Sequence, residues 1–373
     1  MTYHLIIFAL FLAHKLKKMQ SITASNYFIH FGQNGYNKLN SFLKEKNYSK
    51  IFILVDSNTN EFCLSSFLPV LETENPVEII EIEAGEETKN IDTCVELWNI
   101  LIELEGDRKS LIINIGGGVI SDIGGFVAST FKRGIDFINI PTTLLAMVDA
   151  SIGGKNGIDL GNLKNQIGTI TNPQMIVVDS NYLSTLPKNE MRSGLAEMLK
   201  HGLIFDYQYW NEFKNLEQKN FQDFDQLIHR SVEIKNEIVS QDLTENGIRK
   251  ALNFGHTIGH AIESYFLVNE NKKTLLHGEA IAAGMIIEAF ISNKLNLISS
   301  EELAEIHYII SDLFEKININ VEDIKPIMDL LIHDKKNEYG KVQFALLKNI
   351  GHFAINQSAE NSLIEEAFHY YLL

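Results

Sequence analysis

The stretch RKALNFGHTIGHAIE, residues 249–263, combines basic, amide and imidazole side chains at helical spacing. Offsets of 0, 4, 7 and 11 residues line one face of an α-helix, and they are occupied by Arg249, Asn253, His256 and His260. Gly255 and Gly259 stand beside them, and a glycine inside a helix costs about 1 kcal/mol relative to alanine. The pattern predicts either a helix whose backbone is approached closely by a ligand or another segment, or a solvated polar face with a packing notch.

Two further stretches offer side chains that bind metal ions. EMRSGLAEMLKHGLI places Glu197 and Lys200 at positions i and i+3 of a predicted helix, with Glu190 earlier on the same face. His277 opens another predicted helix in LLHGEAIAAGM. One carboxylate and two imidazoles on three helices are the ligand set of a catalytic zinc site that leaves one position for substrate. Such ligands suit zinc or cobalt and do not exclude iron, and the lack of an HExxH motif argues against a metalloprotease.

The stretch LIINIGGGVISDIGGFVAS, residues 111–129, reads as a strand, a glycine turn and a helix. This arrangement presents backbone N–H groups and a helix N-terminus to phosphate. It is not the Rossmann fingerprint, because Ser121 stands where the third glycine belongs. The alternative is a tight turn that needs glycine for its backbone angles. Asp122 is a candidate for a cofactor amide, and Asp56, at a strand end, is a candidate for ribose hydroxyls.

The stretch PTTLLAMVDASIGGKNGIDLGNLKNQIG, residues 141–168, is dense in polar side chains at turns. Gly153 and Gly154 would let the backbone turn sharply and aim Lys155. Three cations available to an anionic substrate are Arg133, Lys155 and Lys164. The alternative is that each is a solvated surface charge.

Short apolar runs alternate with amphipathic stretches in the first half of the chain. The runs predicted as strands are KIFILVD, VEIIEIEA, SLIINIGGG, FINIPTT and MIVVD. Two of them are almost continuously apolar, as expected for strands buried on both faces of a parallel sheet. We therefore predict a doubly wound α/β domain that binds a nucleotide over residues 19–186.

Helical periodicity dominates after Pro187. The predicted helices are 189–203, 222–241, 247–266, 276–295, 300–315 and 322–333. A hairpin is predicted at KVQFALLKNIGHFAI. We expect residues 187–373 to form a mostly α-helical domain that holds the metal and the substrate.

Charge and cysteine content limit the possible partners. A formal net charge of −16 argues against nucleic acid or an anionic membrane as the main partner, because a uniformly acidic surface binds neither. An anionic ligand must then meet a local cluster of cations. Cys63 and Cys94 show no paired spacing, which suits a reducing cytoplasm and excludes a cysteine zinc site.

The first 18 residues form a separate question. Their apolar run from Leu5 to Ala13 is too short to span a bilayer. The basic cluster follows this run instead of preceding it, which is the wrong order for a signal peptide. We expect translation to start at Met19 and residues 1–18 to be a leader, with a membrane anchor as the alternative.

Taken in order, the run from Gly116 to Asn165, SGLAEMLKHGLI, RKALNFGHTIGHAIE and LHGEA resemble the 3-dehydroquinate synthase family of sugar-phosphate cyclases. The similarity extends from Met19 onward. It implies a zinc or cobalt ion held by Glu197, His256 and His277. It also implies that His260 is catalytic or contacts phosphate, and that further residues facing the substrate are Lys235, Arg249 and Asn253.

The same resemblance implies an NAD site. The matching positions are Asp56, Glu86, Lys89, Gly117, Gly118, Val119, Asp122, Thr142, Thr143, Thr185 and Glu190. Positions around the substrate and the nicotinamide are Asp149, Lys155, Lys164, Asn165, Glu197 and Lys200. A late lysine of the family corresponds to Lys335 or Lys336, and the stretch between His260 and His277 is slightly longer than expected.

The resemblance implies an enzyme of the shikimate pathway that converts 3-deoxy-D-arabino-heptulosonate 7-phosphate into 3-dehydroquinate and phosphate with catalytic NAD. It also implies that the enzyme is a homodimer in the cytoplasm. One rival is a sugar-phosphate cyclase whose substrate lacks the carboxylate, against which Arg249 argues. Another is a metal-dependent polyol or alcohol dehydrogenase, which would have little use for so many cations. A third is an inactive NAD-binding regulator, which would not need intact metal ligands.

Overall fold

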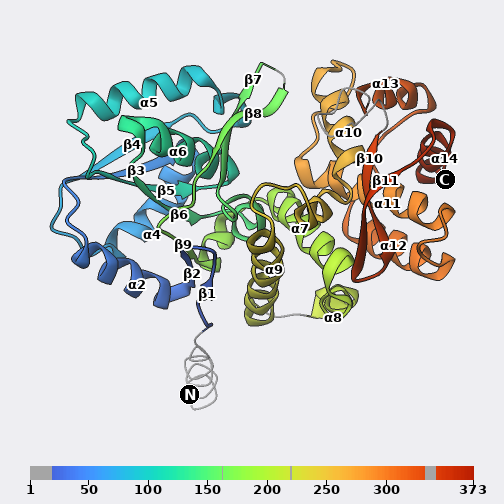
Figure 1. Ribbon diagram of the computed structural model, residues 1–373, viewed down its shortest axis with the longest axis horizontal. Helices are drawn as coiled ribbons and strands as arrows, with labels where there is room; N and C mark the ends of the chain where they lie inside the picture. The colour runs from blue at the N-terminus through green and yellow to red at the C-terminus, as the bar shows by residue number, and fades with distance from the viewer. Residues whose placement is uncertain (1–18, 162, 219–220, 332–341) are drawn as a thin grey trace, which may run out of the picture. The chain divides into compact units, whose positions relative to one another are not determined.

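The computed structural model describes residues 19–161, 163–218, 221–331 and 342–373. The chain forms two compact units (Figure 1). The first unit consists of two segments, the chain up to Thr142 and Gly154–Tyr182. The second unit consists of Thr143–Gly153 and Leu183–Leu373. The predicted leader, residues 1–18, and the candidate lysines Lys335 and Lys336 lie outside the described residues.

A seven-stranded sheet organises the first unit. Its strands are, in spatial order, β1 (Ile22–Thr23), β2 (Phe28–Phe31), β9 (Met175–Val178), β6 (Asp136–Pro141), β5 (Leu111–Gly116), β3 (Ile51–Asp56) and β4 (Val77–Ile82). Neighbouring strands pair in parallel except β1 and β2. The five strands expected from apolar runs are present, and every residue of β5 is buried, as a central parallel strand requires.

The strand order creates a ligand-binding position at one edge of this sheet. From β3 the chain goes outward to β4 and then returns to the other side of β3 as β5. Such a reversal opens a crevice at the carboxyl ends of the two inner strands, where doubly wound folds bind ligands. Asp56 ends β3 and Gly116 ends β5. The topology therefore places both residues at the carboxyl ends of neighbouring strands.

Helices cover both faces of the sheet (Figure 1). On one face, α5 (Ile91–Glu103) and α6 (Gly118–Thr130) bury a cluster that includes Phe52, Ile112 and Phe137. On the other face lies α2 (Gly32–Glu45), whose buried side includes Leu39 and Leu43. The shorter helices are α3 (Ser57–Thr59), η1 (Asn60–Leu64), α4 (Ser65–Phe67), η2 (Leu68–Val70), η3 (Glu86–Thr88), η4 (Phe131–Arg133) and η6 (Ser180–Thr185).

An antiparallel hairpin that the sequence did not indicate follows Gly154. It consists of β7 (Lys155–Leu160) and β8 (Leu163–Ile170). The amide oxygen of Asn156 lies so close to Gly125 of α6 that a Cβ at Gly125 would collide with it. Every residue of β8 is exposed or half-buried, and its sequence lacks the clean apolar alternation by which a strand is recognised.

The second unit is mostly helical. Its helices are α7 (Lys188–Phe205), α8 (Tyr207–Glu212), α9 (Phe221–Gln241), α10 (His256–Val268), α11 (His277–Lys294), α12 (Ser300–Leu313), α13 (Val321–Leu331) and α14 (Asn361–Leu372), with shorter turns η5 (Ala146–Ala150), η7 (Phe213–Gln218) and η8 (Ile248–Asn253). The predicted hairpin is formed by β10 (Gln343–Asn349) and β11 (His352–Ser358). Helix α11 is buried along most of its length and packs against α7, α10, α12 and α14. A helix buried on all sides marks the centre of a core.

Two features differ from the sequence-based expectation. The second unit includes Thr143–Gly153 and begins again at Leu183. The predicted boundary at residue 186 had placed these residues in the first domain. The single helix predicted over 247–266 is wrong, because η8 ends at Asn253, Phe254 has non-helical angles of φ −58° and ψ 128°, and Gly255 is left-handed with φ 78°. Within the described parts of the chain, no helix combines the length and apolar character needed to cross a membrane.

Candidate metal centre and nucleotide-binding loop

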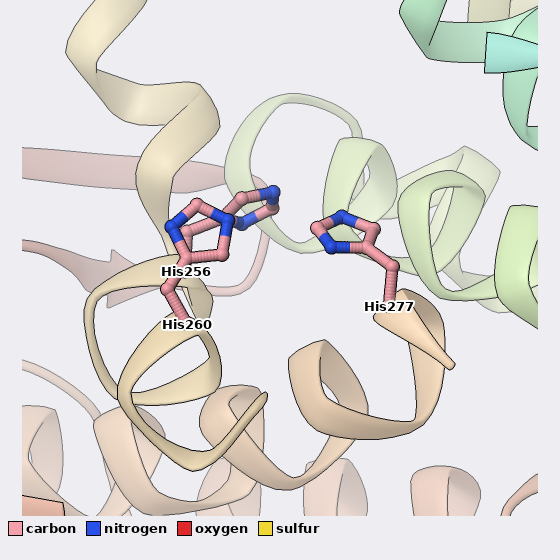
Figure 2. Close-up of side chains that lie close together, drawn as sticks. All are labelled: His256, His260 and His277. Carbon is pink, nitrogen blue, oxygen red and sulfur yellow. The ribbon is translucent and has the colours of Figure 1, made fainter. Parts of the chain in front are cut away.

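Three histidines from two helices of the second unit face one another. His256 begins α10, His260 follows one turn later, and His277 begins α11. Figure 2 shows the rings of the first two turned toward the third. The ring centroids are 5.2 to 5.7 Å apart, and one nitrogen from each ring lies within 4.8 Å of the others. This spacing lets a single cation reach several imidazoles.

Glu197 of α7 completes the cluster. Its Oε1 atom lies 3.4 Å from Nε2 of His256 and 3.3 Å from Nε2 of His277. The carboxylate is completely buried, and neither oxygen accepts a well-formed hydrogen bond from the described residues, although Oε2 forms an ion pair with Lys200. A buried carboxylate oxygen between two imidazole nitrogens fits the donor set of a divalent metal site. The three imidazoles form a second candidate set, and the two sets share His256 and His277.

The electrostatics differ between the two imidazoles. Burial, reinforced by the Lys200 ammonium, lowers the pKa of His256 to about 4, so this ring is neutral and ready to bind a cation at neutral pH. Burial also acts to lower the pKa of His277, but pairing with the carboxylates of Glu197 and Glu263 outweighs burial and raises it to about 9. A metal ion must therefore displace a proton from His277.

Glu263 is a contributor that sequence reasoning missed. Its Oε2 atom lies 3.6 Å from Nδ1 of His277, on the side of the ring away from Glu197. A carboxylate behind a ligating imidazole fixes the orientation and tautomer of the ring. The available signal was spacing, because Glu263 lies one turn beyond His260 on α10.

Buried cations surround this centre. Lys235 donates hydrogen bonds to the backbone oxygen of Asp149 at 2.7 Å and to its carboxylate at 2.5 Å. Burial lowers the pKa of Lys235 to about 8 even though Asp149 opposes the shift. For Asp149, the attraction of Lys235 overcomes the cost of burial and lowers the pKa to about 2. The pair keeps an ammonium group in the interior of the second unit, as anion binding would require.

Arg249 and Asn253 lie on η8 and are held by the preceding loop. The guanidinium of Arg249 donates to the backbone oxygens of Leu243 at 2.9 Å and Gly153 at 3.3 Å. The Asn253 amide donates to Glu245 at 2.6 Å. Arg249 is also buried, and these hydrogen bonds to backbone carbonyls hold its guanidinium in place. Glu245, which the sequence analysis did not single out, thus contacts Asn253, a residue predicted to face the substrate.

His201 of α7 is another buried group that sequence reasoning missed. Its Nδ1 lies 2.7 Å from the Ser231 hydroxyl, and its Nε2 lies 4.0 Å from the Asp149 carboxylate. Burial lowers the pKa of His201 to about 3, so the ring is neutral. Asp149, Glu197 and His201 could in principle hold a cation, but Lys200 and Lys235 already pair with the two carboxylates.

The glycine turn of the first unit joins a strand to a helix, as the sequence predicted. Gly117 is the extended N-cap of α6, and Gly118 and Val119 form the first turn of the helix, partly exposed. Nearby, the Thr142 amide donates to the Gly116 carbonyl at 3.0 Å, which joins the ends of β5 and β6. The free N–H groups of a helix N-terminus attract anions.

Lys89 connects several other predicted residues of the first unit. Its ammonium lies 2.6 Å from Asp122 and 4.0 Å from Glu86, and it donates to Asn165 at 2.7 Å. Burial acts against charging Lys89, but Asp122 and Glu86 outweigh it and raise the pKa to about 12. Lys164 lies 3.6 Å from Glu86. The structure thus brings together five residues that the sequence analysis selected separately.

Other predicted residues are placed individually. The Asp56 carboxylate caps α3 by accepting the Thr59 amide at 2.8 Å. Thr143 accepts the Ala146 amide at 3.2 Å, and Thr185 ends η6. Glu190 lies in the first turn of α7, where burial and the nearby Glu279 raise its pKa. Of the three first-unit cations expected to bind an anion, Arg133 and Lys155 are exposed, at the end of η4 and the start of β7.

Comparison with known proteins decides the family. The family models described as 3-dehydroquinate synthase N-terminal and C-terminal match residues 79–193 and 194–337. A 3-dehydroquinate synthase from Parabacteroides distasonis is 41% identical over 338 residues, which are 90% of this chain and 94% of that protein. The chain belongs to the 3-dehydroquinate synthase family. The resemblance inferred from the motifs is confirmed, and the chain is an enzyme of this family.

Solved structures extend the 3-dehydroquinate synthase family comparison to the fold. A 2-deoxy-scyllo-inosose synthase complexed with carbaglucose-6-phosphate, NAD⁺ and Co²⁺ has a TM-score of 0.81 and 25% identity, covering 94% of this chain and 100% of that chain. A 2-epi-5-epi-valiolone synthase from Streptomyces hygroscopicus with NAD⁺ and Zn²⁺ has a TM-score of 0.81 and 24% identity, covering 95% and 99%. The expected α/β domain followed by a mostly helical part is confirmed as the fold of this family.

Proposed function

We propose that this enzyme converts 3-deoxy-D-arabino-heptulosonate 7-phosphate into 3-dehydroquinate and phosphate, as the shikimate-pathway step of its family. The observation that carries the proposal is the cluster of Glu197, His256 and the half-buried His277 next to the Lys200 ammonium. The 41% identity to a 3-dehydroquinate synthase supports the choice of substrate. We further propose that the enzyme acts in the cytoplasm as a homodimer.

Two bound groups are part of this proposal. The donor set of Glu197, His256 and His277 fits one zinc or cobalt ion. NAD would bind the glycine turn at Gly117 and the Lys89 cluster of the first unit. When bound, the metal supplies a Lewis acid for the hydroxyl to be oxidised and NAD supplies the hydride acceptor. Two structural relatives were crystallised with NAD⁺ and Co²⁺ or Zn²⁺, which supports this assignment.

The cations of the second unit bind and orient the anionic groups of the substrate. Arg249 presents a planar guanidinium, which suits bidentate binding of a carboxylate. Lys200 and Lys235 hold ammonium groups in a buried position, where their attraction for an anion is stronger than in water. His260 adds an imidazole beside His256 and His277 that can accept or donate a proton. These roles follow from side-chain chemistry and the resemblance.

The main rival within the fold is a cyclase whose substrate has no carboxylate. The two crystallised cyclases match at 25% and 24% identity, well below the match to the Parabacteroides distasonis protein. Arg249 also favours a carboxylated substrate, because its planar guanidinium suits bidentate binding of a carboxylate. Three exposed or half-buried positions, Arg133, Lys155 and Lys164, remain proposed phosphate contacts.

A phosphate-release assay tests the function. Enzyme loaded with NAD and zinc is mixed with the heptulosonate 7-phosphate, and free phosphate and dehydroquinate are measured together. We expect one phosphate per dehydroquinate formed. A sugar phosphate without the carboxylate, such as glucose 6-phosphate, is the comparison substrate. Faster phosphate release from the comparison substrate would contradict the proposal and favour the rival cyclase.

A further inference from the structure

Glu288, in the middle of α11, is a buried carboxylate with an unusual pair of partners. Its Oε2 atom accepts the backbone N–H of Gly255 at 2.7 Å, and its Oε1 atom accepts that of Ile258 at 3.0 Å. The side chain has no exposed surface. Both donors belong to the start of α10, the helix that carries His256 and His260.

The start of α10 needs such a partner. The first N–H groups of a helix have no acceptor within the helix, and the side chain of the N-cap residue normally supplies one. Here the N-cap is Gly255, which has no side chain and adopts a left-handed φ of 78°. A Cβ at Gly255 would lie 2.5 Å from Cγ of Met285, so close packing against α11 excludes a conventional N-cap side chain. The Glu288 carboxylate supplies the acceptors and places a negative charge at the positive end of the helix.

This contact joins the two helices that carry the imidazoles. Helix α11 begins with His277 and reaches Glu288 about three turns later. Between them lies Gly284, where a Cβ would collide with the Gly255 carbonyl. Glu263 of α10 contacts His277 in the opposite direction. The relative position of the two helices is therefore set by direct contacts on both sides of the histidine cluster.

We infer that Glu288 is a positioning residue for the metal centre. By holding the first turn of α10 against α11, it keeps His256 and His277 at the separation that one ion requires. The two hydrogen bonds of Glu288 described above are to backbone N–H groups at the start of α10, so its effect on the metal is exerted through that helix. The inference rests on the proposed metal site of Glu197, His256 and His277.

The test is metal affinity in Glu288→Gln. The glutamine keeps the size of the side chain, but its NH₂ group faces one of two N–H donors and cannot accept a hydrogen bond. We expect zinc affinity, measured by competition with a chromophoric chelator, to fall at least about tenfold, as for loss of a partner that orients a ligand. The visible absorption spectrum of the cobalt-loaded variant should also change, because the ligand geometry changes.

Glu302→Gln is the matched control. Glu302 of α12 also accepts two backbone N–H groups, those of Ser299 at 2.8 Å and Ile350 at 3.0 Å, but these partners do not flank a proposed metal ligand as Gly255 and Ile258 do. This variant should lose stability and keep the wild-type zinc affinity and cobalt spectrum. Zinc affinity of Glu288→Gln within twofold of wild type, with a comparable loss of stability in both variants, would show that Glu288 only stabilises the fold.

Two further outcomes are informative. If Glu288→Gln does not fold, Glu288→Asp replaces it, because the shorter side chain keeps the charge and cannot reach both N–H groups. We expect the same loss of zinc affinity in Glu288→Asp, and an affinity within twofold of wild type would again overturn the inference. If the wild-type enzyme itself binds no zinc or cobalt, the proposed metal centre fails and the inference fails with it. Tight binding by wild type and Glu288→Gln alike would overturn the inference alone.

Discussion

Nε2 of His256 lies 3.4 Å from Oε1 of Glu197, so the first residue of α10 meets the middle of α7 inside the second unit. This separation is within ion-pair distance, and neither Glu197 oxygen accepts a well-formed hydrogen bond from the described residues. We therefore expect substitution of Glu197, His256 or His277 by alanine to abolish both bound zinc and activity. Metal content by mass spectrometry and phosphate release measure the two losses.

The first unit should keep its fold in these variants, because its core around Phe52 and Phe137 contains none of the three residues. His352, an exposed histidine at the start of β11, provides the control: His352→Ala should keep its metal and its activity. Full activity of the wild-type enzyme after exhaustive chelation would contradict a catalytic metal.

The alkaline limit of the reaction should reflect Lys235. Burial lowers the pKa of Lys235 to about 8, and the ammonium form is the one that binds an anion. As pH rises through about 8 the free enzyme loses this charge, so kcat/KM should fall. In Lys235→Arg the charge persists at high pH, and the fall should move to higher pH. The same alkaline limb in both proteins would assign the limit to another group.

Lys155 tests whether an exposed cation of the first unit contacts the substrate. Replacement by alanine should lower kcat/KM by an amount equivalent to about 1.5 to 3 kcal/mol, the range for a charge-assisted hydrogen bond. Lys109→Ala removes another exposed lysine of the same unit and should have no effect. Wild-type kinetics in Lys155→Ala would mean that Lys155 is an ordinary surface charge.

NAD should act as a catalyst in this enzyme. If the hydride is removed and returned within one cycle, one equivalent of bound NAD supports many turnovers. With excess substrate, the phosphate formed should equal the substrate consumed. The NADH concentration, measured by its absorbance, should not exceed about the enzyme concentration. NADH produced mole for mole with substrate would instead identify a dehydrogenase.

Gly255 tests the close packing of α10 against α11. A left-handed conformation costs a non-glycine residue about 1 to 2 kcal/mol, and at Gly255 a Cβ would also meet Met285 at 2.5 Å. Gly255→Ala should therefore destabilise the enzyme more than Gly32→Ala, whose φ is +52° but whose Cβ would have no neighbour within 4 Å. Thermal and urea denaturation compare the two. Equal losses of stability would show that the space around Gly255 adjusts.

Strong periodicity made several elements predictable. The helix expected over 276–295 is α11, His277–Lys294, and the helix expected over 189–203 is α7, Lys188–Phe205. Apolar runs likewise marked β3 and β5, because strands at the centre of a parallel sheet are buried on both faces. The side chains proposed as metal ligands were selected by their chemistry and by the resemblance.

Tertiary contacts determined what the sequence did not reveal. The interruption before α10 depends on Gly255, whose left-handed backbone is needed because α11 approaches it closely. Glu263 and Glu288 look like ordinary helical carboxylates in the sequence, and their roles emerge from partners on another helix. The hairpin β7–β8 was missed because β8 lacks a clean apolar alternation in the sequence, and its apolar residues Leu163 and Ile170 are exposed.

The assignment of Thr143–Gly153 to the second unit affects the order in which the protein folds during synthesis. Asp149 leaves the ribosome well before Lys235, its partner on α9. The first unit can complete its sheet once β9 has emerged from the ribosome. The segment with Asp149 stays exposed to solvent until α9, which carries Lys235, has been synthesised. Since contacts between distant parts of the chain form slowly, docking of this segment is expected to be a late step in the assembly of the second unit.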